Sequence, residues 1–213
     1  MRYEALYEQI HAIHPQTIME IGTHLGKRSE MMVRAAREHR NYVHYFGFDL
    51  FDKITEQQTK EEFHGKDKPS YVTARKRLYN SGGVFTLIEG NTLLTLPRFN
   101  PSLPIDFIFV DGGHSIETIQ SDWTQCQRLM HEKTVVIFDD YYIGNQNENV
   151  GCANLVNSLD EVYEVEILLP IDKIEHRNLE IAVVKVCRAV PSYESTLKYI
   201  YEGLGIPKHL IKE

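Results

Sequence analysis

Acidic residues follow two of the most apolar stretches of the sequence. Asp111 ends "IDFIFVD", and the pair Asp139 and Asp140 ends "VVIFDD". If these strands are neighbours in a parallel sheet, their carboxyl ends meet at one edge, where three carboxylates repel one another unless a cation or protons neutralise them. Mg²⁺ accepts carboxylate oxygens and keeps water ligands that a substrate oxygen can replace. The pattern therefore predicts a divalent metal site at Asp111, Asp139 and Asp140.

Turn formation is the alternative interpretation of the same acids, because "DGG" and "DDY" both suit turns. His114, three residues after Asp111, is also open to two interpretations. It could act as a general base or contact a substrate. It could equally cap the helix that follows or make a core contact.

A glycine pattern follows the first apolar segment. Glu20, Gly22 and Gly26 form E-x-G-x-x-x-G in "MEIGTHLGKRS". Such glycines allow a tight turn and a close ligand approach, and the next helix offers free N–H groups. An acid more than twenty residues further on, Asp49 first and Asp52 second, is placed to bind the hydroxyls of a ribose. The alternatives are a simple strand-to-helix turn and a capping acid.

These residues lie between alternating helix and strand patterns. Apolar residues at helical spacing end before Pro15, and a second stripe from Ile116 to Leu129 predicts a helix that packs on a sheet. Near-continuous apolar strands separated by helices are typical of a mostly parallel sheet covered on both faces. We expect parallel strands at 17–22, 42–51, 84–90, 105–111 and 133–142, and a closing pair from "YEVEILLPI" and "LEIAVVKVC".

Composition limits the domain organisation and the partners. The chain has 213 residues, of which 42% are hydrophobic, enough for one α/β domain with a sizeable core. The formal charge of −7 argues against a broad nucleic-acid or membrane-surface footprint. No apolar run near the start is long enough for a signal peptide, so we expect a cytoplasmic protein. The three cysteines lack the spacing of a zinc site or disulfide framework.

We expect one domain over residues 1–190 and a helical tail at 191–213. The tail could pack on its own domain or on a second copy, so a homo-oligomer is one expectation. Residues 52–69 are polar and charge-mixed, which suits a lid inserted in the domain.

Taken in this order and at these spacings, "MEIGTHLGKRS", "GFDLFD", "LIEGNT", "IDFIFVDGGHSIETIQSDW" and "VVIFDDYY" resemble the class I S-adenosylmethionine-dependent methyltransferases. The branch most similar contains the macrocin-type and other small-molecule O-methyltransferases, and the resemblance covers roughly residues 1–186. It implies a Rossmann-like, doubly wound sheet of seven strands, mostly parallel with an antiparallel last strand, and helices on both faces.

The resemblance also implies the site. S-adenosylmethionine would be the cofactor, bound by Glu20, Gly22, Thr23, Gly26, Asp49, Gly90, Asn91, Thr92 and Asp111. Asp111, Asp139 and Asp140 would hold Mg²⁺, which orients a substrate hydroxyl and lowers its pKa. The candidate catalytic residues are then His114 and Asp111. Asn91 stands where many relatives have Asp, and "DGGH" departs from their "DGD" followed by Tyr.

We therefore expect an enzyme that methylates a hydroxyl of a small molecule with the help of a divalent metal, without a nucleic-acid or membrane partner. One alternative is a metal-independent methyltransferase that uses His114 as its base. Another is a non-catalytic nucleotide-binding or NAD-binding Rossmann-like protein, which the absence of G-x-G-x-x-G disfavours. The sequence leaves the methyl acceptor open, including the choice between oxygen and nitrogen.

Overall fold

The computed structural model describes residues 1–56, 67–144, 150–175 and 179–190. Most of the expected lid and the whole expected C-terminal tail lie outside these residues. Both assignments therefore stay predictions.

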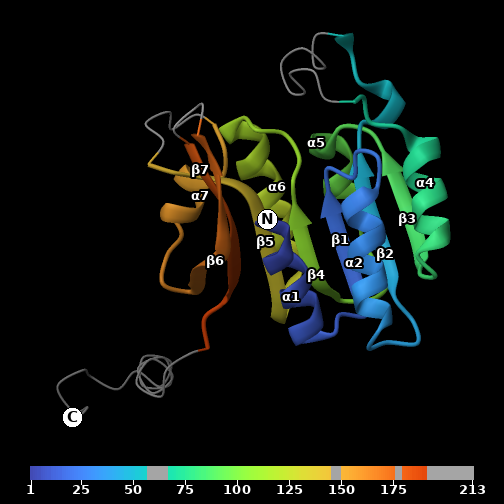
Figure 1. Ribbon diagram of the computed structural model, residues 1–213, viewed down its shortest axis with the longest axis horizontal. Coiled ribbons are helices and arrows are strands. Elements are labelled where there is room, and N and C mark those ends of the chain that lie inside the picture. Colours follow the sequence, from blue (N-terminus) through green and yellow to red (C-terminus); the bar gives the residue numbers. More distant parts are fainter. Residues whose placement is uncertain (57–66, 145–149, 176–178, 191–213) are drawn as a thin grey trace, which may run out of the picture.

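The described residues form one sheet of seven strands in the order β3-β2-β1-β4-β5-β7-β6 (Figure 1). The first five strands pair in parallel, and β7 runs antiparallel to both β5 and β6. This confirms the predicted fold. The strands are β1 (Thr17–Ile21), β2 (His44–Asp49), β3 (Val84–Glu89), β4 (Ile105–Val110), β5 (Met130–Ile143), β6 (Tyr163–Ile174) and β7 (Leu179–Arg188).

Burial on both faces explains the continuous apolar runs of the central strands. Every residue of β1 is buried, and so are five of the six residues of β4. A strand covered on both faces has no solvent side that would require alternating polar residues. At the sheet edge, β3 is more exposed and its sequence mixes polar with apolar side chains.

Helices cover the two faces in separate groups. One face carries α1 (Tyr3–Ile13), α2 (Lys27–Arg37) and α4 (Tyr71–Asn80) over one buried cluster. The other carries α6 (Ile116–Leu129) and α7 (Ala153–Asn157) over a second cluster, and the short helix α5 (Thr92–Thr95), which has no buried residue, lies beside α6. Two short 3₁₀ turns, η1 (Phe51–Lys53) and η2 (Leu96–Arg98), complete the described elements. No helix in the described ranges is long and apolar enough to cross a membrane.

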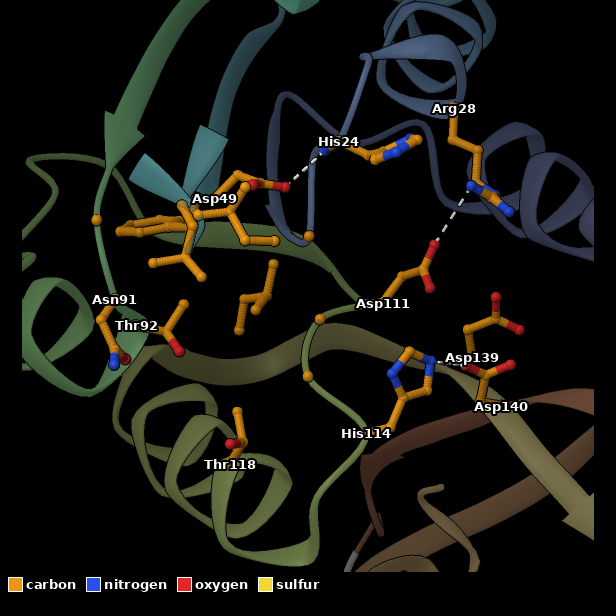
Figure 2. Close-up of a pocket in the computed structure, with 18 of the residues that line it drawn as sticks. His24, Arg28, Asp49, Asn91, Thr92, Asp111, His114, Thr118, Asp139 and Asp140 are labelled. Carbon is orange, nitrogen blue, oxygen red and sulfur yellow. Dashed lines mark hydrogen bonds and ion pairs between the residues drawn. The ribbon is translucent and has the colours of Figure 1, made fainter. Parts of the chain in front are cut away.

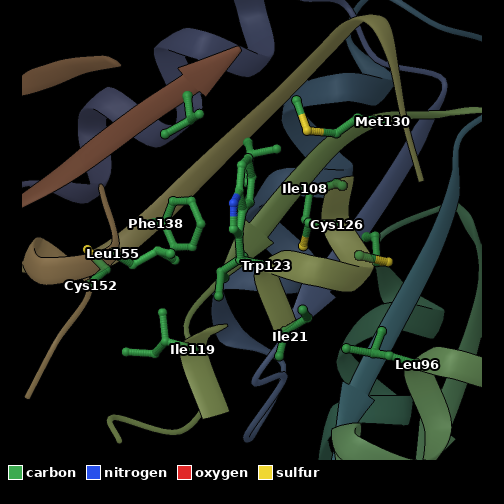
Figure 3. Packing of buried hydrophobic residues seen from close by; sticks show 14 of the residues in the cluster. Ile21, Leu96, Ile108, Ile119, Trp123, Cys126, Met130, Phe138, Cys152 and Leu155 are labelled. Carbon is green, nitrogen blue, oxygen red and sulfur yellow. The ribbon is translucent and has the colours of Figure 1, made fainter. Parts of the chain in front are cut away.

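Helix α6 packs as its apolar stripe predicted. Ile119, Trp123 and Cys126 are buried, and the Trp123 ring lies 5.7 Å from that of Phe138 on β5 (Figure 3). This packing fixes the start of α6, and with it the loop that carries His114, against the carboxyl ends of β4 and β5. Ser115 caps the helix, since its side chain accepts a hydrogen bond from the Thr118 N–H.

Candidate active site

A cavity of about 570 Å³ lies at the carboxyl ends of the central strands (Figure 2). Open α/β sheets bind ligands at this edge, near the point where strand order reverses. Here the reversal falls between β1 and β4, which are neighbours in the sheet but not in the sequence. Of the residues predicted for the site, the cavity wall includes Gly22, Asp49, Gly90, Asn91, Thr92, Asp111, His114, Asp139 and Asp140.

The glycine loop requires its two glycines for different reasons. Gly22 has φ +94°, and a Cβ there would lie 1.8 Å from the carbonyl oxygen of Asp111. Gly26 has φ +73° and packs against Ala74 of α4, whose Cα would be 2.9 Å from an added Cβ. Gly22 lines the cavity, whereas Gly26 sets how α2 starts and packs.

Glu20 precedes this loop and Thr23 belongs to it, and neither is among the described residues that line the cavity. Both are buried, and the Glu20 carboxylate accepts hydrogen bonds from the hydroxyls of Ser29 and Tyr45. Thr23 Oγ1 is 3.1 Å from the Tyr45 hydroxyl. Burial raises the pKa of Glu20 to about 7. The predicted contacts of Glu20 and Thr23 with a cofactor are therefore not seen on the cavity wall, and their buried hydrogen bonds instead hold the glycine loop to α2 and β2.

Asp49 braces the loop and faces the cavity at the same time. Its Oδ2 accepts a hydrogen bond of 2.7 Å from the His24 N–H, and its Oδ1 accepts one of 2.7 Å from the Phe51 N–H. Burial raises the pKa of Asp49, while these N–H groups oppose the shift. Asp52, the second candidate, does not line the cavity within the described chain and accepts a hydrogen bond from the Tyr71 N–H instead.

The far wall of the cavity follows β3 and the start of α6. Asn91 caps α5 by accepting a hydrogen bond of 2.9 Å from the Leu93 N–H, so its side-chain oxygen already has a structural role. Thr92, Gly112 and Thr118 also line the cavity.

Asp122 lies behind this wall and was not predicted from the sequence. It is 1% exposed, and neither carboxylate oxygen has a hydrogen-bond partner of normal geometry within the described part of the chain. A Cβ on Gly112 would be 3.6 Å from its Oδ2. Burial raises the pKa of Asp122 to about 7 against an opposing effect of the Thr92 hydroxyl. The sequence feature that could have indicated a buried Asp122 is its place next to Trp123, in the helix whose apolar stripe faces the core.

The three predicted acids come together at the opposite end of the cavity. Ligand oxygens of Asp111, Asp139 and Asp140 all lie within 4.8 Å of one another (Figure 2). Asp140 has φ +55°, at a place where the pairing of β5 with β7 shifts register. This irregularity lets two consecutive acids of one strand approach the same site, because regular β-structure would point them to opposite faces.

Two arginines and a tyrosine, none of them predicted, contact this cluster. Arg2 Nε donates a hydrogen bond of 2.7 Å to Asp139 Oδ1, and Arg28 Nη1 lies 3.4 Å from Asp111 Oδ2. The Tyr3 hydroxyl donates a 2.6 Å hydrogen bond to Asp139 Oδ2. Burial and then the charge of Asp139 raise the pKa of Tyr3, so it stays a phenol at neutral pH.

With Arg2 in this position, Mg²⁺ does not fit among the three acids. Both oxygens of Asp139 accept hydrogen bonds from Arg2, and Asp140 contacts Arg2 and His114. A divalent ion needs these same lone pairs and would place a second positive charge beside the guanidinium. The expected metal therefore stays a prediction that requires Arg2 to withdraw.

His114 pairs with the cluster rather than capping α6. Its Nε2 is 2.7 Å from Asp140 Oδ2, and its ring projects toward the cavity from the loop after β4 (Figure 2). A carboxylate at this distance holds an imidazole in one orientation. Of the two interpretations of His114, this geometry favours a chemical role.

Comparison with known proteins identifies the family. Residues 19–141, more than half of the chain, match the family described as a methyltransferase domain. The chain belongs to this methyltransferase family. A search of curated proteins gave no match.

Solved structures share the fold of this methyltransferase. An O-methyltransferase from Bacillus cereus in complex with S-adenosylhomocysteine is 15% identical, with a TM-score of 0.62 over 88% of this chain and 82% of that one. The O-methyltransferase TomG from Streptomyces achromogenes, in complex with S-adenosylmethionine, is 15% identical, with a TM-score of 0.60 over 87% and 79%. A methyltransferase from Podospora anserina with bound S-adenosylhomocysteine is 15% identical, with a TM-score of 0.53 over 89% of this chain and 80% of that one.

Proposed function

We propose that this methyltransferase transfers a methyl group from S-adenosylmethionine to a hydroxyl group of a small molecule, with His114 as the general base. The observation that carries the proposal is the 2.7 Å contact between His114 and Asp140 on the wall of the cavity. The glycine loop and Asp49 line the same cavity. A base and a nucleotide-binding wall therefore face one space.

The cavity suits the proposed cofactor in size and in chemistry. Its volume of about 570 Å³ is within the range of ligand pockets, roughly 300–1,000 Å³. Gly22 leaves the backbone open to a ligand, and Asp49 is placed to accept hydrogen bonds from ribose hydroxyls. The fold neighbours from Bacillus cereus and Streptomyces achromogenes are O-methyltransferases solved with S-adenosylhomocysteine and S-adenosylmethionine, which supports the same choice.

Bound S-adenosylmethionine would supply a methyl group on a positively charged sulfur. The acceptor oxygen forms its bond to the methyl carbon as the carbon–sulfur bond breaks and its electron pair stays on sulfur. The hydroxyl proton passes to the imidazole of His114, and the carboxylate of Asp140 stabilises the imidazolium that forms. Asp111 lies beside this route, and its carboxylate is held by Arg28.

A methyl-transfer assay tests this function. The full chain is incubated with methyl-labelled S-adenosylmethionine and a panel of small acceptors that carry hydroxyl, amine or thiol groups. We expect transfer to a hydroxyl acceptor and release of S-adenosylhomocysteine in equal amount. Transfer to amine acceptors alone would contradict the hydroxyl assignment, and S-adenosylhomocysteine formation without a methylated product would contradict the transfer.

A further inference from the structure

The guanidinium of Arg2 is bound on each of its nitrogen positions. Nε and Nη2 donate to the two oxygens of Asp139 at 2.7 and 3.1 Å, which is a two-point pairing. Nη1 donates to Asp172 Oδ2 at 3.1 Å, and Nη2 also lies 3.5 Å from Asp140 Oδ1. One cation thus reaches two consecutive acids of β5 and a third acid on β6.

This contact is part of the fold and not a surface ion pair. The Arg2 side chain is 14% exposed and that of Asp139 is 2% exposed. The Arg2 N–H donates to Asp172 Oδ1 at 3.0 Å, which fixes the backbone as well as the side chain. A buried pair of charges persists only when it is well aligned and further hydrogen-bonded, and both conditions hold here.

Tyr3 orders the two arginines around the cluster. The guanidinium carbon of Arg2 lies 4.6 Å from the centre of the Tyr3 ring and that of Arg28 lies 3.9 Å from it. The tyrosine hydroxyl accepts hydrogen bonds from both arginines and donates one to Asp139. Helix α1 sets this arrangement in place, since Leu6 and Ile10 are fully buried.

We propose that Arg2 is the resident cation of the acidic cluster and takes the place that a divalent metal ion holds in metal-dependent O-methyltransferases. The positive charge of Arg2 offsets the repulsion between the carboxylates, which would otherwise require a metal ion or protons. Arg2 at one oxygen of Asp140 and His114 at the other hold that carboxylate in the orientation that the base requires. Arg2 is thus a positioning residue, and methyl transfer needs no divalent metal.

The catalytic part of this inference rests on the proposed function, but its test does not. Metal binding is measured on the purified full chain without substrate or cofactor. If no methyl transfer is found, the metal-binding result still tests the role of Arg2. If the metal-binding result contradicts the role of Arg2, the methyl-transfer assay still tests the proposed function.

The probe is Mn²⁺ alone, and its binding is measured by electron paramagnetic resonance. The protein is first treated with a chelator to remove bound metal, and it carries no N-terminal tag. We expect the unaltered chain to bind no Mn²⁺ up to about 1 mM, which is the weak end of protein sites for hard divalent cations. Arg2→Gln frees the carboxylates and should bind Mn²⁺ at least about tenfold more tightly. Tight stoichiometric binding to the unaltered chain, unchanged by Arg2→Gln, would overturn the proposal.

Further variants separate this role from a purely structural one. Arg2→Lys keeps a positive charge at the cluster and should bind Mn²⁺ more weakly than Arg2→Gln. The double variant Arg2→Gln/Asp139→Asn removes both members of the buried pair, so it should fold even where the single variant does not, and it should lose the gained Mn²⁺ binding. Arg34→Gln removes an exposed pair with Glu30 and serves as the control with no gain. Equal Mn²⁺ binding by all four variants would contradict a specific role of Arg2.

Discussion

At the scale of single residues, His114 is the group on which the proposed chemistry depends most. His114→Ala removes the proton acceptor, and we expect the turnover number to fall by about 10²–10⁴. Affinity for S-adenosylhomocysteine should change little, because the glycine loop and Asp49 are untouched. Steady-state kinetics with a hydroxyl acceptor, together with calorimetry, check both parts.

His131→Ala is the matched control for His114. His131 also pairs with an acid, Asp106, but it is not on the wall of the described cavity. Its replacement should leave the turnover number unchanged. Full activity of His114→Ala, or equal losses in both variants, would contradict the assignment of the base.

Asp49 gives a second prediction at this scale. Asp49→Ala removes the expected ribose contact and the brace on His24, so S-adenosylhomocysteine should bind at least about tenfold more weakly, a loss of about 1.4 kcal/mol. Asp52→Ala changes a nearby acid that does not line the described cavity and should bind as the unaltered chain does. Calorimetric titration distinguishes the two, and equal weakening in both variants would argue against a specific ribose contact.

At the scale of elements, α6 connects the core to the site. Trp123 is 4% exposed and fills the space between α6 and β5. Trp123→Ala should lower the free energy of unfolding by about 3–5 kcal/mol, the usual cost of removing a large buried aromatic side chain. Urea denaturation measures this loss, and a cost below about 1 kcal/mol would mean that this face is not part of a packed core.

Asp122 on the same helix makes stability depend on pH. Its pKa is about 7 in the folded chain and ordinarily 3.8, so folding favours the neutral acid. The unfolded chain then holds fewer protons between these values, and stability falls as pH rises from about 4 to about 7. Asp122→Asn stays neutral and avoids this loss.

The variant should therefore be more stable than the unaltered chain, by a difference that grows up to pH 7 and levels off above it. The growth should not exceed about 1.4 kcal/mol per pH unit. Denaturation curves at several pH values between 5 and 8 test this. A difference that is constant across the range would show that Asp122 is already ionised at the acid end.

At the scale of the whole molecule, the sequence predicted the sheet well because its central strands are buried on both faces. Continuous apolar segments such as 105–110 leave little choice of structure, and the acids after them must then lie at one edge. This geometry places Asp111, Asp139 and Asp140 at one edge, whereas the approach of both consecutive acids to one site also needs the irregularity at Asp140, which the sequence pattern did not predict.

Residues whose role depends on how helices cross the sheet could not be predicted. Arg2 and Tyr3 reach the site only because the start of α1 lies against the sheet near Asp139 of β5 and Asp172 of β6, and no local pattern encodes this contact. Glu20 belongs to a glycine-loop pattern, yet the side chain turns away from the cavity toward Ser29 and Tyr45. Such contacts between distant segments depend on tertiary packing, which overrides local sequence signals.

The central claim is that the cavity at the carboxyl edge of the sheet holds S-adenosylmethionine. Calorimetric titration of the full chain with S-adenosylhomocysteine, with NAD in a parallel cell, tests it most directly. The account predicts one site per chain with a dissociation constant on the order of micromolar, about −8 kcal/mol, and no binding of NAD. Binding of NAD alone, or of neither compound, would contradict it.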